Sequence, residues 1–210
     1  HNKKALIRVD FNVPFNGERI SDNSRILAAL PTIKYVLENG GSCIVMSHLG
    51  RPKKREKKFS LINVKYELER LLDHVVIFVE NCIGPDAKKA SEELMPGEVL
   101  LLENLRFYKE ETVGDEKFAQ ELSFLADIYI NDAYGTTHRA HASTSTIAKY
   151  FDEKSPGLLL EKEIFCLKKV LESPKKPVTA IVGGAKVSSK ISIIANMLKV
   201  IDNLVIGGGM

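Results

Sequence analysis

The sequence has little of three features that would point to particular protein classes: cysteine, long apolar runs and charge of one sign. Its three cysteines, Cys43, Cys82 and Cys166, are odd in number and far apart in a chain of 210 residues. This spacing argues against a disulfide framework or a cysteine metal site, and it fits reduced thiols in the cytoplasm. No apolar run approaches the roughly 18 residues that a membrane span requires, so we expect no membrane partner.

The net charge of +3 is too small to indicate nucleic acid or an anionic membrane as the main partner. One basic run, "RPKKREKK" at 51–58, contains no interleaved aromatic residue. Aromatic side chains on which bases stack are typical of single-strand binding, so we expect this run to be a solvated loop.

Two nucleotide-binding motifs are also absent. No G-x-x-x-x-G-K-[ST] occurs, which argues against a P-loop kinase, and no G-x-G-x-x-G follows the first predicted strand, which argues against a dinucleotide oxidoreductase. The overall composition, 44% apolar and 27% charged, is ordinary for a globular protein with a sizeable core.

Short apolar runs alternate along the chain with segments of helical periodicity. The pattern predicts strands at 5–11, 42–47, 75–79, 98–104, 127–133 and 178–182, and helices at 26–37, 60–73, 85–94, 115–126, 156–172 and 191–200, with a short helix at 143–151. Ser60 is the expected N-cap of the second helix. Continuous apolar strands that alternate with helices predict an α/β fold, in which a parallel sheet is covered by helices on both faces.

The long helix at 156–172 is flanked by prolines, and the strand–helix pattern starts again after it with a strand that we expect to be buried. We therefore predict one α/β domain over 1–155, an interdomain helix over 156–173, and the start of a second, similar α/β domain over 174–210. Because the chain opens on histidine and closes on a strand and a glycine turn, we expect it to be a fragment.

Polar residues follow four of the predicted strands at the point where each strand ends. Ligands of open parallel sheets bind at the carboxyl ends of the strands, so these side chains are expected to meet at one edge. They are Asp10, Asn12, His48, Arg51, Arg106, His138, Arg139 and His141, with Arg25 at the start of the first helix.

Arginine pairs its donors with phosphate or carboxylate oxygens, so this cluster predicts a site for a small, highly anionic ligand. Asp10 and Asn12 would accept from ligand hydroxyls or orient the arginines. Taken singly, each arginine is more simply a surface residue. His138 and His141 have no cysteine or acidic partners, which argues against a metal site.

The segment "GGAKVSSK" at 183–190 lies at a strand-to-helix turn and carries Lys186 and Lys190 four residues apart. Two like charges at this spacing repel each other, and cations oppose the helix dipole at this end. The negative charge of a bound phosphate would relieve both costs. The two glycines would let backbone N–H groups approach that phosphate. A tight turn with two solvated lysines is the alternative.

Six segments of the chain are distinctive in combination and order. They are "RVDFNVP" at 8–14, "SHLGRP" at 47–52, "ENLRF" at 103–107, "NDAYGTTHRAHAS" at 131–143, "GGAKVSSKI" at 183–191 and "IGGGM" at 206–210. Together they resemble the signature segments of the phosphoglycerate kinase family. The resemblance implies reversible phosphoryl transfer between 1,3-bisphosphoglycerate and ADP, giving 3-phosphoglycerate and ATP, by a monomeric cytoplasmic enzyme of glycolysis.

The resemblance also assigns roles to individual residues. Substrate contacts would be Asp10, Asn12, Arg25, His48, Arg51, Arg106 and Arg139. Nucleotide contacts would be Gly183, Gly184, Lys186, Lys190, Gly208 and Gly209. Arg25 and Lys186 would be the catalytic pair that meets the transferring group, and Mg²⁺ would arrive with ADP or ATP on ligands outside this chain.

The chain departs from the family pattern in its length, because family members are roughly twice as long. A non-catalytic domain that binds phosphoglycerate or another small anion is therefore the alternative function.

Overall fold

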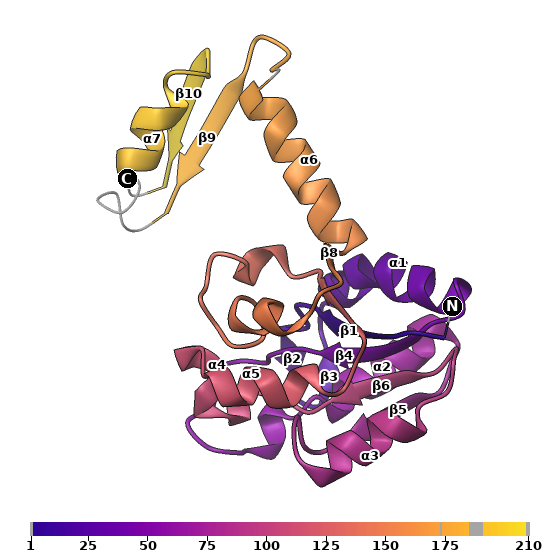
Figure 1. Ribbon diagram of the computed structural model, residues 1–210. Coiled ribbons are helices and arrows are strands. Elements are labelled where there is room, and N and C mark those ends of the chain that lie inside the picture. The colour runs from indigo at the N-terminus through magenta and orange to yellow at the C-terminus, as the bar shows by residue number, and fades with distance from the viewer. Residues whose placement is uncertain (1, 173, 185–190, 209–210) are drawn as a thin grey trace. The chain divides into compact units, whose positions relative to one another are not determined.

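The computed structural model describes residues 2–172, 174–184 and 191–208 (Figure 1). It divides into two compact units, His1–Glu161 and Lys162–Met210, which we describe separately. The division of the chain into domains at 155 and 173 remains a prediction.

The first unit is built on a six-stranded parallel sheet with the order β5-β6-β4-β1-β7-β8. The strands are β1 (Lys4–Arg8), β4 (Ser42–Met46), β5 (Val76–Val79), β6 (Val99–Leu102), β7 (Ile128–Asn131) and β8 (Lys154–Pro156). All residues of the central strands β4 and β6 are buried, which explains why their sequences are apolar without alternation. The predicted parallel sheet is confirmed.

Helices cover both faces of this sheet, as predicted. They are α1 (Ser24–Glu38), α2 (Ile62–Leu72), α3 (Pro85–Glu93), α4 (Lys109–Val113) and α5 (Glu116–Ser123). Adjacent residues of β1 belong to different cores: Ile7 packs in a core with side chains of α1 and α2, whereas Leu6 packs in a core with side chains of α3 and α5. This division follows from the alternation of side chains along a strand.

Several short elements were not predicted from the sequence. They are the hairpin strands β2 (Phe15–Asn16) and β3 (Arg19–Ile20), the edge strand β8, helix α4, and the 3₁₀ turns η1 (Lys57–Phe59), η2 (Leu105–Phe107) and η3 (Tyr134–Thr136). The helix expected near 143–151 is a 3₁₀ turn, η4 (Thr146–Tyr150).

The predicted N-cap of α2 was wrong by one residue. Leu61 is the capping residue by position, and its side chain cannot accept a hydrogen bond. The Ser60 hydroxyl nevertheless accepts from the Ile62 N–H at 3.2 Å, so serine still satisfies one of the free donors at the helix start.

Helix α6 (Leu158–Glu172) begins in the first unit and continues into the second. The second unit contains the parallel pair β9 (Thr179–Gly183) and β10 (Asn203–Gly207) with helix α7 (Ile191–Met197). The prediction that its first strand is buried was wrong for most of its residues: only Ala180 is buried, and Ile181 is 77% exposed. Among the described residues, β9 pairs with β10 alone, which leaves it with little cover.

Candidate functional site

The carboxyl ends of four neighbouring strands bring the predicted substrate residues to one edge of the first unit. Strands β6, β4, β1 and β7 are adjacent in the sheet, and a loop or 3₁₀ turn follows each of them. Asp10 and Asn12 follow β1, His48 and Arg51 follow β4, Arg106 lies in η2 after β6, and Arg139 follows η3 after β7.

Asp10 holds Arg25 in place. The Arg25 guanidinium donates to Oδ2 of Asp10 at 2.5 Å, while the Arg25 side chain remains half exposed. Oδ1 of the same carboxylate accepts from the Asn12 N–H at 3.2 Å. Asp10 therefore orients an arginine, which is one of the two functions that its sequence position suggested.

Asn12 connects two of the loops. Its Oδ1 accepts from the Gly50 N–H at 2.8 Å, which ties the loop after β1 to the loop after β4. The Arg106 guanidinium donates to the Gly50 carbonyl oxygen at 2.6 Å, so the loop after β6 is attached at the same point. Gly50 has a positive φ of 61°, and a Cβ there would meet the Phe59 ring at 2.5 Å. A side chain at residue 50 would thus disturb the joint between three loops.

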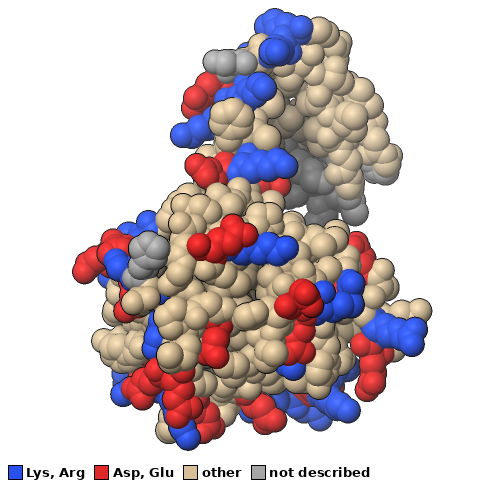
Figure 2. Space-filling view, turned by 90° about the vertical axis from the view of Figure 1, so that its right-hand side faces the viewer, with Lys and Arg blue, Asp and Glu red and all other residues tan. Residues whose placement is uncertain are grey.

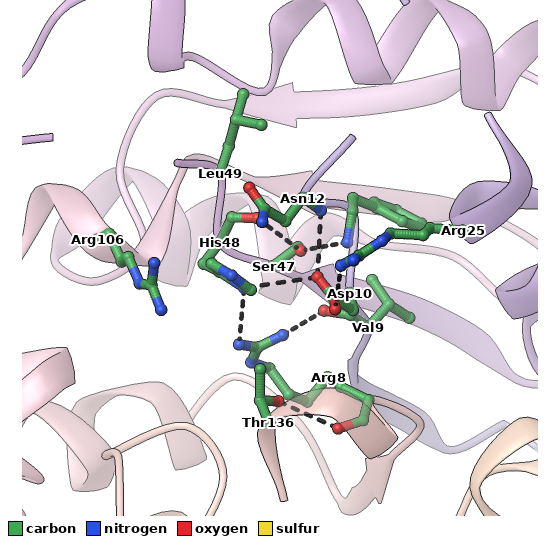
Figure 3. A network of polar contacts seen from close by, with 12 residues as sticks. Arg8, Val9, Asp10, Asn12, Arg25, Ser47, His48, Leu49, Arg106 and Thr136 are labelled. Carbon is green, nitrogen blue, oxygen red and sulfur yellow. Dashed lines mark hydrogen bonds and ion pairs between the residues drawn. The ribbon is translucent and has the colours of Figure 1, made fainter. Parts of the chain in front are cut away.

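His48 is buried, with 4% exposure, and Nδ1 of its ring lies 3.2 Å from the Arg8 guanidinium (Figure 3). Burial lowers the pKa of His48 to about 2, and the positive charges of Arg8, Arg106, Arg139 and Arg25 act in the same direction. The ring is therefore neutral at physiological pH, and its 3.8 Å approach to the Asp10 carboxylate is not an ion pair there.

A pocket of about 310 Å³ brings three of the predicted arginines together. It is lined by Arg51, Pro52, Arg106, Tyr108, Lys109, Thr112, Arg139 and His141. Four of these carry permanent positive charge and none is acidic. Burial lowers the pKa of Arg106, as do the charges of Arg139, Arg8 and Arg51, although arginine stays protonated at any physiological pH. The lining is suited to phosphate or carboxylate groups.

The sequence-based prediction missed a group of buried polar residues that lie against His48 and His141. Arg8, with 1% exposure, donates from Nε to the Ser143 hydroxyl at 2.9 Å. That hydroxyl donates to the fully buried Glu111 at 2.6 Å, and Glu111 also accepts from the Ser143 N–H at 2.9 Å. The available signal was an arginine inside an apolar strand, because arginine is rarely buried unless it has partners.

His141 lines the basic pocket, whereas His138 is exposed. Nδ1 of His141 lies 3.7 Å from the Glu111 carboxylate. Burial lowers the pKa of His141, the negative charge of Glu111 opposes this, and the charges of Arg106, Arg139 and Arg8 lower it further. The ring is therefore a mainly neutral part of the pocket wall at physiological pH.

Of the predicted nucleotide-site residues, Gly183, Gly184 and Gly208 are described, and Lys186, Lys190 and Gly209 lie outside the described residues. Gly183 pairs with Gly207 at the carboxyl ends of β9 and β10, which places the three described glycines at one strand edge. Gly184 and Gly208 have φ values of 128° and 75°, a region that side chains disfavour.

The described residues contain neither a cluster of metal-ligating side chains nor a membrane-spanning helix. Within 2–172, 174–184 and 191–208, no group of three or more histidine, cysteine, aspartate or glutamate side chains could hold a metal ion. No helix in this part of the chain has the length and apolar character needed to cross a membrane.

Charge is mixed in sign on one face of the first unit. On the face seen in Figure 2, lysine and arginine are interspersed with aspartate and glutamate. The basic pocket is therefore a local feature, as a net charge of only +3 leads one to expect.

Comparison with known proteins places the whole chain in one family. The family model for phosphoglycerate kinase matches residues 1–210. Phosphoglycerate kinase of Moorella thermoacetica is 54% identical over all of this chain, and that of Clostridium botulinum (strain Hall) is 49% identical over 99% of it. This chain spans 53% of the length of each of these relatives.

Solved structures give the same result. Phosphoglycerate kinase from Coxiella burnetii matches all of this chain with a TM-score of 0.87 at 39% identity, and the match covers 52% of that protein. The enzyme from Pyrococcus horikoshii matches 99% of this chain with a TM-score of 0.89 at 34% identity, covering 53% of that protein. The chain belongs to the phosphoglycerate kinase family.

Proposed function

We propose that this chain supplies the phosphoglycerate-binding part of a phosphoglycerate kinase. The reaction is reversible phosphoryl transfer between 1,3-bisphosphoglycerate and ADP, which gives 3-phosphoglycerate and ATP. One observation carries the proposal: the 310 Å³ pocket draws permanent cations from the loops after three different strands and has no carboxylate in its lining. Such a pocket favours a small ligand with several negative charges.

The substrate contacts are divided between two groups of residues. Arg51, Arg106 and Arg139 bind the 3-phosphate with His48 beside them, and Asp10 and Asn12 hold the loops and Arg25 in place. Arg25, half exposed and oriented by Asp10, meets the transferring phosphoryl group. Phosphoryl transfer depends mainly on positioning and on stabilisation of the equatorial oxygens, which arginine supplies without any proton transfer.

The nucleotide contacts belong to the second unit. Gly183, Gly184, Gly208 and Gly209 let the backbone approach ADP or ATP, Lys190 binds its phosphates, and Lys186 follows the transferring group. Mg²⁺ accompanies the nucleotide and neutralises phosphate charge; no described residue is assigned to it. We place the enzyme in the cytoplasm as a monomer, and no observation favours the non-catalytic alternative.

Calorimetric titration of the chain with 3-phosphoglycerate tests the proposal. We expect binding that weakens as salt is raised, and a loss of at least about 100-fold in affinity for Arg51→Ala/Arg139→Ala, because each arginine makes a charge-assisted hydrogen bond. Lys88→Ala/Lys89→Ala is the matched control, since it removes two exposed positive charges from α3. Equal affinity of both double variants and the unaltered chain would contradict the proposed site.

A further inference from the structure

The Arg8 side chain is a buried cation held entirely by neutral groups. Nε donates to the Ser143 hydroxyl, one terminal nitrogen donates to the Val9 carbonyl oxygen, and the other lies 3.2 Å from Nδ1 of His48 (Figure 3). Arg8 forms no ion pair with any carboxylate that the structure describes, and the negative charge of Glu111 reaches it only through Ser143. Burying a cation without an ion pair is costly in free energy, so we expect Arg8 to have a function beyond packing.

The contact with His48 determines the position of the imidazole proton. A guanidinium has donors and no acceptor, so Nδ1 of His48 must present its lone pair to Arg8. In a neutral ring the proton is then on Nε2.

The Asp10 carboxylate favours the opposite arrangement but is too far away to impose it. Its Oδ1 lies 3.8 Å from Nδ1 of His48, beyond hydrogen-bond range, whereas the nitrogen of Arg8 is 3.2 Å away. Both oxygens of Asp10 are already used, one by the Arg25 guanidinium and the other by the Asn12 N–H.

Nε2 of His48 is free to contact a ligand. It has no hydrogen-bond partner among the described residues, and in this part of the chain no fully buried side-chain nitrogen or oxygen lacks a partner. Nε2 therefore lies at the accessible surface, although the residue as a whole is only 4% exposed. The positive charges of Arg106, Arg139 and Arg25 act on the same ring, so three cations that could hold an anion lie near His48.

We propose that Arg8 is a positioning residue that fixes His48 in its Nε2–H tautomer, so that the ring offers a hydrogen-bond donor to the anionic substrate. The alternative tautomer would direct a lone pair at that anion and repel it. Arg8 thus acts through His48 and does not itself contact the substrate. This inference rests on the proposed function only for the identity of the ligand.

The test is ¹⁵N NMR of the histidine-labelled chain, because protonated and bare ring nitrogens have well-separated shifts. We expect bare Nδ1 and protonated Nε2 for His48 at neutral pH, both without ligand and with 3-phosphoglycerate. Arg8→Met should abolish this preference, and Arg8→Lys should retain it because lysine still donates. Arg55→Met, which removes an exposed arginine elsewhere, should leave the spectrum of His48 unchanged.

Binding of 3-phosphoglycerate supplies the second measurement. Arg8→Met should weaken binding about tenfold in the presence of His48, the loss expected from one hydrogen bond to a charged group, and by clearly less in a His48→Ala background. Protonated Nδ1 in the unaltered chain would overturn the inference even if Arg8→Met does not fold. Absence of binding by the unaltered chain with bare Nδ1 would instead contradict the proposed function and leave the tautomer assignment standing.

Discussion

At the scale of single residues, the site depends on which charges are buried and how each is compensated. Glu111 is fully buried, and its carboxylate accepts from both the N–H and the hydroxyl of Ser143. His48 is buried without a charge, because its ring is neutral at physiological pH. Arg106 keeps its charge at the pocket wall, where its guanidinium donates a hydrogen bond to a backbone carbonyl oxygen. Burial of polar groups is tolerated here because each has a partner.

The low pKa of His48 predicts a pH-dependent stability. The unfolded chain binds a proton there near pH 6.5, whereas the folded chain binds it near pH 2. Between these values the unfolded state holds more protons, so the free energy of unfolding rises with pH by up to about 1.4 kcal/mol per unit. The contribution of His48 is complete above pH 6.5 and is lost as the pH falls.

Urea unfolding from pH 4 to 8 measures this contribution as a difference between proteins. His48→Asn keeps an acceptor for Arg8 but cannot titrate, so its stability should fall less steeply toward low pH than that of the unaltered chain. His74→Asn, at an exposed position, is the control and should leave the slope unchanged. Parallel pH profiles for all three proteins would show that His48 titrates normally in the folded state.

At the scale of elements, the start of α6 depends on side chains from distant parts of the first unit. Oδ1 of the fully buried Asp132, at the end of β7, accepts from the N–H groups of Leu159 and Leu160 at 3.0 and 3.1 Å. The Thr32 hydroxyl on α1 accepts from the Leu158 N–H at 3.0 Å and donates to Asp132 at 2.6 Å. Three free donors of the helix are thereby satisfied.

Replacing Asp132 should therefore be costly. Asp132→Ala leaves one buried and one part-buried amide donor without an acceptor, and we expect a loss of about 2–4 kcal/mol in urea unfolding. Asp132→Asn should cost less, because the amide oxygen can still accept from both. Asp115→Ala removes an N-cap of α5 that accepts one N–H at 2.8 Å, so it should cost only about 1 kcal/mol. Equal losses at Asp132 and Asp115 would contradict the proposed importance of the buried cap.

Gly157 lies against the same carboxylate. A Cβ at this residue would be 2.3 Å from Oδ1 of Asp132, whereas a Cβ at Gly135 would make an ordinary contact of 3.5 Å. Gly157→Ala should thus destabilise the chain by about 1–3 kcal/mol through overpacking, and Gly135→Ala by clearly less. Thermal unfolding of the two variants measures the difference; a smaller effect at residue 157 than at residue 135 would disprove the argument.

Most elements were predictable from local pattern because they bury one face or a whole strand. The exceptions share a physical reason. Strand β8, "KSP", is exposed and polar, and it is a strand only because β7 offers it an edge. The joint of Asn12, Gly50 and Arg106 likewise could not be predicted, since its hydrogen bonds join residues 38 and 56 positions apart.

At the scale of the whole molecule, the two units differ in how much apolar surface they bury. The first unit contains both hydrophobic cores. In the described part of the second unit, Ala180 is the only buried apolar residue, while Ile181, Ile191 and Ile206 are each more than half exposed. Stability against local opening follows burial, so the units should open independently and at different free energies.

Hydrogen exchange followed by mass spectrometry tests this difference. We expect amides of β9 and β10 to exchange at least about 100-fold faster than those of β1 and β4, because opening the small pair exposes little that was buried. Adding 3-phosphoglycerate should slow exchange in the loops after β1, β4 and β6 and leave β9 and β10 unchanged. Equal protection of backbone amides from exchange across the whole chain would contradict the independent opening of the two units.

The sequence by itself determined the parallel α/β sheet, the order of its strands along the chain and the edge at which the basic loops gather. These follow from local periodicity and from the geometry common to parallel strands. Only the tertiary structure decided that Arg8 is buried against His48, that Ser143 links it to Glu111, and that Asp132 caps α6. The partners in these contacts lie 27 to 135 residues apart, and no local pattern records which distant side chain will satisfy a buried polar group.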